Sequence, residues 1–459
     1  MIFSQYPSHW IEAKIGYKYS VQLGKMLQPE PRDENDILRP YLRAANIFWD
    51  KIDLSDVNEM YFSPKEIDKF SLRKSDLLVS EGGDVGRSCI WNNRAVMYFQ
   101  NALNRIRERK KSDCTTQFLY YWLYHLKSCG YISMLCNVAT ISHYTAEKLK
   151  ATFFVFPPLE EQKSIVKFLD YKTEQIDKLI EKKEKLLKLL EEKRIALITN
   201  AVTGHCHSEP DLSGEESPTP SLSQMKSSGV EWLGNIPQHW EVKRLKFAVK
   251  LVNEKIDTEE VELLYMGLEN IESWTGKKNE TTDYLPEGVA NKFIKDDVLF
   301  GKLRPYLAKV FLTKEDGCCT TEALVLRSKS QVVPKFLSYY LLSNMFIEVV
   351  NSSTFGSKMP RASWEFIGSL AFLLPPLKEQ ESIVEYLDIE LTKTDQLSEQ
   401  VNKAIEKLKE YRTSLIASAV TGKIDLRNWQ PPQISLSLLR RWTQGEACTE
   451  QSRSVEEVN

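Results

Sequence analysis

A stretch of 48 residues occurs twice in this chain, and no other feature constrains the fold as strongly. Residues 157–204 align without a gap to residues 375–422, at an offset of 218, and 23 of the 48 positions are identical. The copies begin PPLEEQKSIVKFLD and PPLKEQESIVEYLD, and both end in AVTG. A repeat this long predicts a chain of two similar halves, which would address a target that itself has two parts.

Each copy is predicted to form one long α-helix. Residues 159–203 and 377–421 contain neither glycine nor proline, and a helix of that length would extend about 65 Å. A Pro-Pro pair precedes each stretch and a glycine follows it, as helix termini favour. Apolar residues recur at spacings of four and three, so the two helices are expected to pack on each other. The predicted apolar stripe comprises Ile165, Leu169, Ile176, Leu179, Leu186, Leu190 and Leu197 in the first copy, and Ile383, Leu387, Leu397, Val401, Ala404, Leu408 and Leu415 in the second.

The region before each helix is predicted to be a globular α+β domain with a mostly antiparallel or mixed sheet. Short β-rich runs such as DLLVS and DVLFG alternate with helical segments such as 116–127 and 334–350. The two regions match loosely, for example PSHW with PQHW and YLRAANI with YMGLENI. The predicted boundaries are 1–156 for the first domain, 157–204 for the first helix, 205–223 for a flexible linker, 224–374 for the second domain, 375–422 for the second helix and 423–459 for a largely disordered tail.

Composition is that of an ordinary soluble protein, with 42% hydrophobic and 27% charged residues. The N-terminus does not resemble a signal peptide, and no apolar run is long enough to cross a membrane. Eight scattered cysteines indicate reduced thiols, so a cytoplasmic location is expected. The net charge of −2 suggests that this chain alone would make few contacts with DNA phosphates, and that partners would supply more.

Both halves place basic residues on a glycine-containing loop that follows a predicted strand. Arg87 follows EGGDVG in the first half, and Lys302, Arg304 and Tyr306 lie in GKLRPY in the second. An arginine can bind guanine through a bidentate fork, or bind a phosphate, although a solvated basic turn would look the same. The first loop is not a nucleotide-binding loop, because its glycine spacing is wrong and no Gly-Lys-Ser/Thr follows.

Other polar residues lie in the basic run of the first half, in the segments just ahead of the long helices, and in the matched YLRAANI and YMGLENI blocks. A run of charge is usually only solvated, but these positions are also candidates for contact with DNA. They are Arg43, Asn46, Arg105, Arg107, His143 and Tyr144 in the first half, and Asn270, Lys358 and Arg361 in the second.

Motifs that would carry chemistry are missing. The sequence has no glycine-rich loop for a nucleotide or for S-adenosylmethionine, no Asn-Pro-Pro-Tyr-type tetrapeptide and no reactive residue set shared by the halves. His205-Cys206-His207 has no second cluster at ligand spacing, so no metal site is expected. A duplicated chain that keeps its frame but no catalytic motif is predicted to be a non-catalytic component.

The repeated elements resemble those of the specificity subunits of type I restriction–modification systems. The resemblance rests on PPLxEQxxIxxxLD, on the Lys/Glu-rich helix that closes in AVTG, and on the Pro-x-His-Trp opening of each half. The segment MKSSGVEWLG at 225–234 is also typical of this family. The resemblance covers nearly the whole chain, and it is weakest inside the globular regions.

The resemblance implies two target recognition domains that read the two parts of a split, asymmetric DNA sequence. The long helices would pair as an antiparallel coiled coil with internal pseudo-twofold symmetry, set the spacer, and dock two DNA adenine methyltransferase subunits. Motor-nuclease subunits would add ATP-dependent translocation and cleavage. This chain would bind no cofactor, since S-adenosylmethionine, ATP and Mg²⁺ would belong to its partners. Readers on one face of B-DNA lie about 35 Å apart, which such helices are long enough to span.

Two other classes of function are compatible with the residues. In a scaffold, the paired helices would hold two protein-binding domains and show no selectivity for DNA. A fused enzyme would need a catalytic motif, which the sequence does not contain.

Overall fold

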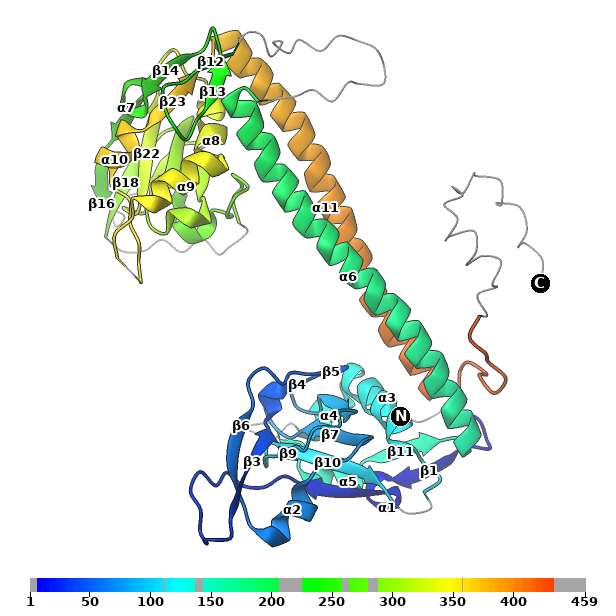
Figure 1. Cartoon of the computed structure of the whole chain (residues 1–459). Helices are drawn as coiled ribbons and strands as arrows, with labels where there is room; N and C mark the ends of the chain where they lie inside the picture. The colour runs from blue at the N-terminus through cyan, green and yellow to red at the C-terminus, as the bar shows by residue number, and fades with distance from the viewer. Residues whose placement is uncertain are drawn as a thin grey trace, which may run out of the picture. The chain divides into compact units, whose positions relative to one another are not determined.

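Figure 1 shows the computed structural model, which describes residues 6–109, 112–136, 143–205, 225–257, 264–279, 288–356 and 358–432. The chain forms two compact units. Unit 1 contains residues up to Glu181 together with those from Ile405 onward, and unit 2 contains Lys182–Ala404. Most of the predicted linker and tail, residues 206–224 and 433–459, lies outside the described residues.

The first domain is built on a four-stranded antiparallel sheet in the order β2-β10-β7-β8. A three-stranded sheet, β6-β3-β9, and two two-stranded pairs, β1-β11 and β4-β5, complete it. Its elements are β1 Ile11–Lys14, α1 Ile15–Lys18, β2 Tyr19–Leu23, β3 Ile37–Leu42, η1 Ala44–Asn46, β4 Ile47–Phe48, β5 Lys51–Ile52, β6 Asn58–Phe62, α2 Pro64–Phe70, β7 Asp76–Ser80, β8 Ser88–Trp91, β9 Tyr98–Phe99, β10 Leu103–Glu108, α3 Thr116–Ser128, α4 Tyr131–Cys136, α5 Ala146–Ala151 and β11 Phe153–Phe156.

The second domain repeats this main sheet, in the order β15-β22-β19-β20, and again pairs its first and last strands, β14 and β23. Its elements are β12 Met225–Ser227, β13 Asn235–Pro237, β14 Glu241–Arg244, α7 Leu245–Ala248, β15 Val249–Val252, β16 Lys255–Asp257, β17 Leu264–Met266, η4 Leu268–Asn270, β18 Val289–Phe293, β19 Asp297–Gly301, η5 Pro305–Leu307, β20 Val310–Leu312, β21 Gly317–Cys319, β22 Ala323–Ser328, α8 Pro334–Leu342, α9 Asn344–Ser352, α10 Trp364–Ser369 and β23 Ala371–Leu374.

The domains differ most in their second sheet. In the first domain β3 lies between β6 and β9, whereas in the second domain β21 lies between β18 and β17. The parallel pair β3 and β9 corresponds to the parallel pair β17 and β21. The antiparallel neighbour joins the first strand of the pair in the first domain, as β6 joins β3, but the second strand in the second domain, as β18 joins β21. The α+β class and the internal repeat are therefore confirmed, and the divergence between the halves is concentrated in this sheet.

The segment 334–350, expected as one helical run, contains two helices, α8 and α9. The chain is extended at Ser343, between them, where φ is −64° and ψ is 140°. The serine hydroxyl donates a hydrogen bond to the carbonyl of Tyr340, so this side chain satisfies the end of α8. Serine competes for backbone groups in this way, which favours helix ends over helix interiors.

The two long helices are α6, Leu159–Thr203, and α11, Leu377–Val420, and each contributes to both units. Unit 1 joins the N-terminal part of α6 to the C-terminal part of α11, and unit 2 joins the remaining parts, so the helices run antiparallel in both. Ile165, Leu169 and Leu415 share one core in unit 1, and Leu387 is buried in the core of unit 2. This confirms the predicted packing of the two helices.

The predicted apolar stripe is wrong at three leucines. Leu179, Leu186 and Leu397 are exposed, at 47%, 37% and 42% of their surface. Leu179 and Leu397 occupy equivalent positions of the repeat. The apolar spacing identifies one face of each helix, but the partner helix is too narrow to cover every residue near that face.

Each globular domain is attached to its own long helix by the residues of the repeated motifs. The buried Gln162 side chain donates to the carbonyls of Pro157 and Asp113 and accepts from the amide of Thr115, at 2.8–3.0 Å. Gln380 makes the same contacts with Pro375, Gln331 and Val333.

The His-Trp pairs contact the same helix starts. Glu161 accepts hydrogen bonds from the Trp10 indole, at 3.2 Å, and lies 2.8 Å from the His9 ring. Glu379 does the same for Trp240 and His239. The two motifs that are separated in the sequence are thus one structural joint, present once in each unit.

The end of each long helix also packs on a Pro-x-His-Trp segment. Gly422 approaches Pro7 and Trp10 in unit 1, and Gly204 approaches Pro237 in unit 2, so closely that a Cβ on either glycine would meet the proline ring at 2.4 Å. Beyond Gly422 the chain stays packed for several residues. Leu426 is buried in the unit 1 core, and Trp429 lies edge-on to Phe168.

Candidate nucleic-acid interface

In unit 2, the loop after β19 and the segment before α10 are hydrogen-bonded to each other. The Arg304 amide donates to the Pro360 carbonyl at 2.8 Å, and the Ala362 amide donates to the Lys302 carbonyl at 3.0 Å. Leu303 and Arg361 form an isolated antiparallel bridge. Lys302, Arg304, Tyr306, Lys358 and Arg361, which are far apart in the sequence, are therefore brought together; we call this set the paired-loop surface.

The side chains of the paired-loop surface remain largely available to a ligand. Arg304, Lys358 and Arg361 are exposed, Tyr306 is 46% exposed and Lys302 is half-buried. The Arg304 backbone is left-handed, with φ of 51°, which is unusual for a residue other than glycine and is a strained conformation. The Glu322 carboxylate binds Arg361 at 3.0–3.3 Å and raises the pKa of that exposed guanidinium, which therefore stays charged.

Two apolar residues of this surface were not predicted from the sequence. Phe355 is 83% exposed and Met359 is 53% exposed, and Phe355 forms a bridge with Arg361. Exposed apolar side chains beside basic ones are typical of surfaces that contact both bases and phosphates. The only sequence signal was an aromatic residue in a segment of small polar residues, SSTFGSKMPR.

Unit 1 has the equivalent pair of loops, with different side chains. The Tyr144 amide donates to the Glu81 carbonyl at 2.8 Å, as the Ala362 amide does to Lys302. The exposed His143 therefore occupies the place of Arg361, and its ring lies next to Gly82. Burial raises the pKa of the Glu81 carboxyl group, and the nearby His143 opposes this shift.

Arg43 immediately precedes η1, and Arg87 binds the first residue of that helix. The Arg87 guanidinium donates to the Ala44 carbonyl at 2.9 Å and lies over the ring of Phe48. Arg43 forms an ion pair with Asp56 at 2.6 Å. The side chains of Arg87 and Arg43 are partly exposed, at 20% and 28%.

Asn46 and Asn270 are not placed to contact DNA. Both are buried, and each side-chain oxygen accepts a hydrogen bond of 2.8 Å from a backbone amide three residues earlier, that of Arg43 or Gly267. The Asn46 amide group also donates to the carbonyls of Asp53 and Asp56. These asparagines shape equivalent loops in the two halves, which explains why the surrounding blocks match.

Arg105 and Tyr144 are buried, and Arg107, whose side chain is 21% exposed, is held by partners within the domain. Arg105 is buried, donates to the carbonyls of Lys69 and Ser71, and burial lowers its pKa to about 10. Arg107 makes two hydrogen bonds of 2.6 Å with Asp76. Tyr144 is completely buried, and its hydroxyl group lies 2.7 Å from that of Thr152. These three residues support the domain, because their polar groups are used by internal partners.

Within the described part of the chain, no group of three or more His, Cys, Asp or Glu side chains is arranged to hold a metal ion. Of the His-Cys-His segment only His205 is described, and its ring contacts the hydroxyl group of Thr203. None of the described helices is long and apolar enough to span a membrane.

Two domains of one fold, each with loops joined by an equivalent hydrogen bond but with different side chains, define a duplicated protein with two distinct surfaces on one frame. The chain belongs to the type I restriction modification DNA specificity domain family, whose model matches residues 21–191 and 237–407. This repeated match, one to each half, favours DNA recognition over the scaffold alternative.

Similar proteins include two specificity subunits. The chain is 25% identical over 319 residues to the type I restriction enzyme EcoDI specificity subunit of Escherichia coli, covering 67% of this chain and 70% of that protein. It is 25% identical over 338 residues to the MjaVIII specificity subunit of Methanocaldococcus jannaschii, covering 70% and 73%.

Solved structures share the fold. A chain from work on complex assembly and conformational transition of the type I R-M system matches with a TM-score of 0.66 at 15% identity, covering 92% of this chain and 100% of that one. The crystal structure of the HsdS subunit from Thermoanaerobacter tengcongensis matches with a TM-score of 0.50, also at 15% identity and with the same coverage.

Proposed function

We propose that this chain is the non-catalytic subunit that gives a type I restriction–modification complex its DNA specificity. Each recognition domain binds one part of a split, asymmetric target, and the long helices set the spacer between the parts. The observation that carries the proposal is the pair of loops joined by an equivalent backbone hydrogen bond in both domains but carrying different side chains. A common frame with different contact residues is what two readers of different sequences require.

In the second domain, Arg304, Lys358 and Arg361 supply positive charge from two adjoining loops. Lys302 and Tyr306 lie beside them, with Phe355 and Met359 as apolar neighbours. In the first domain, Arg43, Arg87 and His143 are the remaining candidates. Basic groups of this kind bind phosphates or the acceptor atoms of guanine, while aromatic and apolar groups contact bases.

The partners of the chain are double-stranded DNA, two DNA adenine methyltransferase subunits and motor-nuclease subunits. Leu179 and Leu397 support a pair of identical partners, because the same exposed leucine recurs on both helices at equivalent positions. The partners would carry S-adenosylmethionine, ATP and Mg²⁺, and the methyltransferase would bear the energetic cost of extracting the adenine from the stack. The complex would act in the cytoplasm.

Methylome sequencing with and without this gene tests the proposal. We expect one split adenine motif to disappear when the gene is deleted and to return with the wild-type gene. Persistence of every split motif would refute the proposal for this chain. A gel shift with the co-expressed methyltransferase, at a salt concentration that suppresses non-specific binding, tests the scaffold alternative, which predicts no DNA selectivity.

The role of the helices as a spacer has its own test. Seven residues of helix inserted at an exposed stretch of α6 preserve the face that packs on α11 but lengthen the helix by about 10 Å. We expect a changed spacer or the loss of methylation. An unchanged motif would contradict this part of the proposal.

A further inference from the structure

An almost buried arginine occurs at the same position of both long helices. Arg194 of α6 and Arg412 of α11 are separated by the repeat offset of 218, and their side chains are only 9% and 8% exposed. Each arginine contacts an aspartate of the other long helix and a loop of the recognition domain in its unit. Three elements therefore meet at one guanidinium group in each unit.

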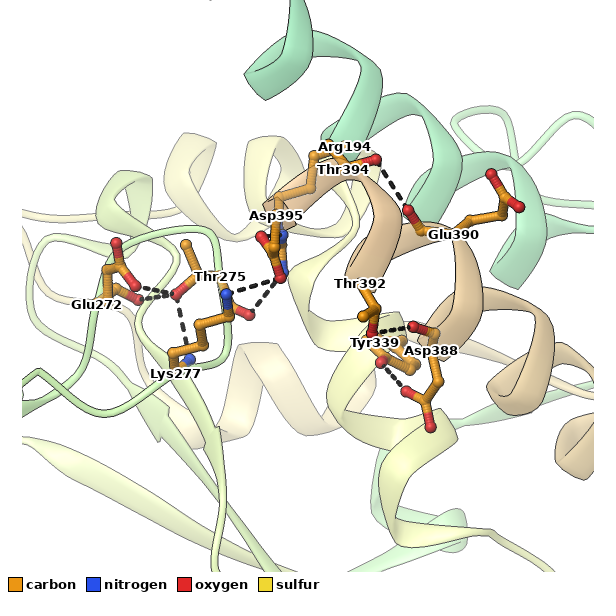
Figure 2. Close-up of polar contacts among 10 residues, drawn as sticks. All are labelled: Arg194, Glu272, Thr275, Lys277, Tyr339, Asp388, Glu390, Thr392, Thr394 and Asp395. Carbon is orange, nitrogen blue, oxygen red and sulfur yellow. Dashed lines mark hydrogen bonds and ion pairs between the residues drawn. The ribbon is translucent and has the colours of Figure 1, made fainter. Parts of the chain in front are cut away.

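In unit 2 the contacts are made by Arg194, Asp395 and the loop after η4 (Figure 2). The Arg194 Nη1 atom lies 2.5 Å from Asp395 Oδ1, and its Nη2 donates to the carbonyl of Thr275 at 3.1 Å. Lys277, from the same loop, binds the other oxygen of Asp395 at 2.7 Å. The loop is thus attached to α6 through a backbone carbonyl and to α11 through a lysine–aspartate ion pair.

In unit 1 the same two helix positions are used. Arg412 Nε donates to Asp177 at 3.1 Å, and its Nη2 binds Asp50 of the recognition domain. The hydroxyl group of Tyr120, on α3, donates to the other oxygen of Asp50. Asp177 and Asp395 are equivalent in the repeat, whereas Asp50 replaces a carbonyl and a lysine of unit 2. The helix residues are shared, and the domain residues are not.

A second contact of each domain lies two helical turns away. Tyr339 of α8 donates to Asp388 of α11, and Lys335 binds the same carboxylate at 2.7 Å. In unit 1, Tyr121 donates to Asp170 at 2.7 Å. Two attachment points along one helix fix both the position and the rotation of a domain on that helix.

The polar contacts matter because the domain is not closely packed on the helices there. A cavity of about 580 Å³ lies beside them in unit 2 and is lined by Arg194, Lys277, Tyr339, Asp388 and Asp395 among others. An apolar helix seam can shift by a heptad and still bury apolar groups, whereas a buried charge is satisfied only where its partner lies.

We propose that the Arg194–Asp395 and Arg412–Asp177 pairs are positioning devices that hold each recognition domain at one place along its helices and so fix the spacer of the target. This inference rests on the proposed function. It assigns the spacer to particular residues as well as to helix length, and neither arginine needs to touch DNA.

The test uses the complex of the full chain with its methyltransferase and a set of DNA duplexes whose two target parts are separated by different numbers of base pairs. Arg194→Met keeps the length of the side chain but removes its charge. We expect the preference for the best spacer over spacers one base pair longer or shorter to fall at least about tenfold, as loss of a buried ion pair allows. The two half-site sequences themselves should still be required.

Lys403→Met is the matched control, because Lys403 belongs to an exposed ion pair with Glu399 on α11. It should leave the spacer preference unchanged. The exchange variant Arg194→Asp/Asp395→Arg restores opposite charges and should recover part of the preference. If the methionine variant fails to fold, Arg194→Lys takes its place. Lysine keeps the charge but cannot form the two-pronged contact of the guanidinium group, so we expect an intermediate spacer preference.

A measurement without DNA separates this inference from the proposed function. Hydrogen exchange of the backbone amides at 274–277 should be faster in Arg194→Met than in the wild-type complex, and unchanged in Lys403→Met. Unaltered exchange, or a lower melting temperature with an unchanged spacer preference, would overturn the inference. Methylation of no split target by the wild-type complex would instead refute the proposed function, while the exchange result would still decide whether the loop is held.

Discussion

Arg304 and Arg361 reach the same surface from two loops that are hydrogen-bonded to each other. Arg304 is held in a left-handed backbone conformation, and Arg361 is oriented by Glu322. Because the loop geometry is fixed by backbone contacts, each side chain can be changed with little effect on the fold. These two arginines are therefore the clearest residues for a test of DNA binding.

We expect Arg304→Ala and Arg361→Ala each to weaken the binding of target DNA by the complex. If the side chain contacts a phosphate, the slope of log affinity against log salt concentration should decrease in magnitude by about 0.9. Binding to all DNA sequences should then weaken equally. If it contacts a base, about 1–3 kcal/mol of binding should be lost with relaxed specificity at one position. A salt titration by gel shift distinguishes these results, with Lys403→Ala as the control; wild-type affinity in both variants would contradict the assignment.

Gln162 and Gln380 provide a paired test of stability. Leucine at either position leaves a backbone amide and two carbonyls of a buried joint without their partner. We expect Gln162→Leu and Gln380→Leu each to lower the free energy of unfolding of its own unit by about 1–3 kcal/mol. Urea denaturation measures this change, and Gln400→Leu, at an exposed position of α11, should have little effect. A neutral result at both positions would mean that the joint does not stabilise the units.

Several candidate contact residues are buried or held by internal partners, for a reason that is physical. Asn46 and Asn270 were predicted as contacts because they are polar residues of matched blocks. Two domains that bind different DNA sequences need different contact residues, so a residue that both share is better explained by a role in the fold. Arg105 and Arg107 belong to a basic run in the sequence, but both lie on strand β10, which directs their side chains toward neighbouring elements. There they bind backbone carbonyls and Asp76. Burial of a polar group depends on partners distant in the sequence, which spacing alone does not reveal.

At the scale of elements, the long helices were predictable because helix signals are local. Prolines, glycines and apolar spacing indicated both helices and their mutual packing. The choice of buried residues was not fully predictable, since coverage depends on the partner helix. The exposed Leu179 and Leu397 are therefore informative, because the partner helix leaves a leucine uncovered at the same position of both helices.

We expect Leu179→Glu and Leu397→Glu each to impair the binding of one of two methyltransferase subunits, since a charge opposes burial of that site in an interface. The mass of the complex, measured by light scattering, should fall by one partner for each single variant and by two for the double variant. Lys178→Glu, one residue away on a solvated face, is the control. Full assembly of the double variant would exclude these leucines as docking residues.

At the scale of the whole molecule, the domain fold could be placed only in a broad class from the sequence. The main sheet was signalled by runs such as DLLVS, which forms β7. The arrangement of β17, β18 and β21 could not be predicted, because strand order is decided by contacts between distant segments. Each unit contains parts of both long helices. Which part of α6 packs on which part of α11 likewise depends on contacts between distant segments.

The two units should differ when parts of the chain are expressed alone. We expect the fragment 182–404 to unfold cooperatively, because it contains all the segments of unit 2. The fragment 1–181 lacks the part of α11 that covers Ile165, Leu169 and Ile176, so it should aggregate or unfold without a sharp transition. Calorimetry compares the two fragments. Adding residues 405–432 as a separate peptide should make the unfolding of fragment 1–181 more cooperative. Equal cooperativity of the two fragments would contradict this view.

The division of unit 1 between the two ends of the chain has a consequence for biosynthesis. At typical translation rates of about 5–20 residues per second, the first domain leaves the ribosome many seconds before the C-terminal part of α11 is made. During this interval the apolar face of the N-terminal part of α6 lacks the residues of α11 that complete its core. Unit 2 can complete its core earlier, although it begins later in the sequence. Chaperones therefore have a defined segment of the nascent chain to protect, the N-terminal part of α6. This period ends only when residues 405–420 emerge from the ribosome.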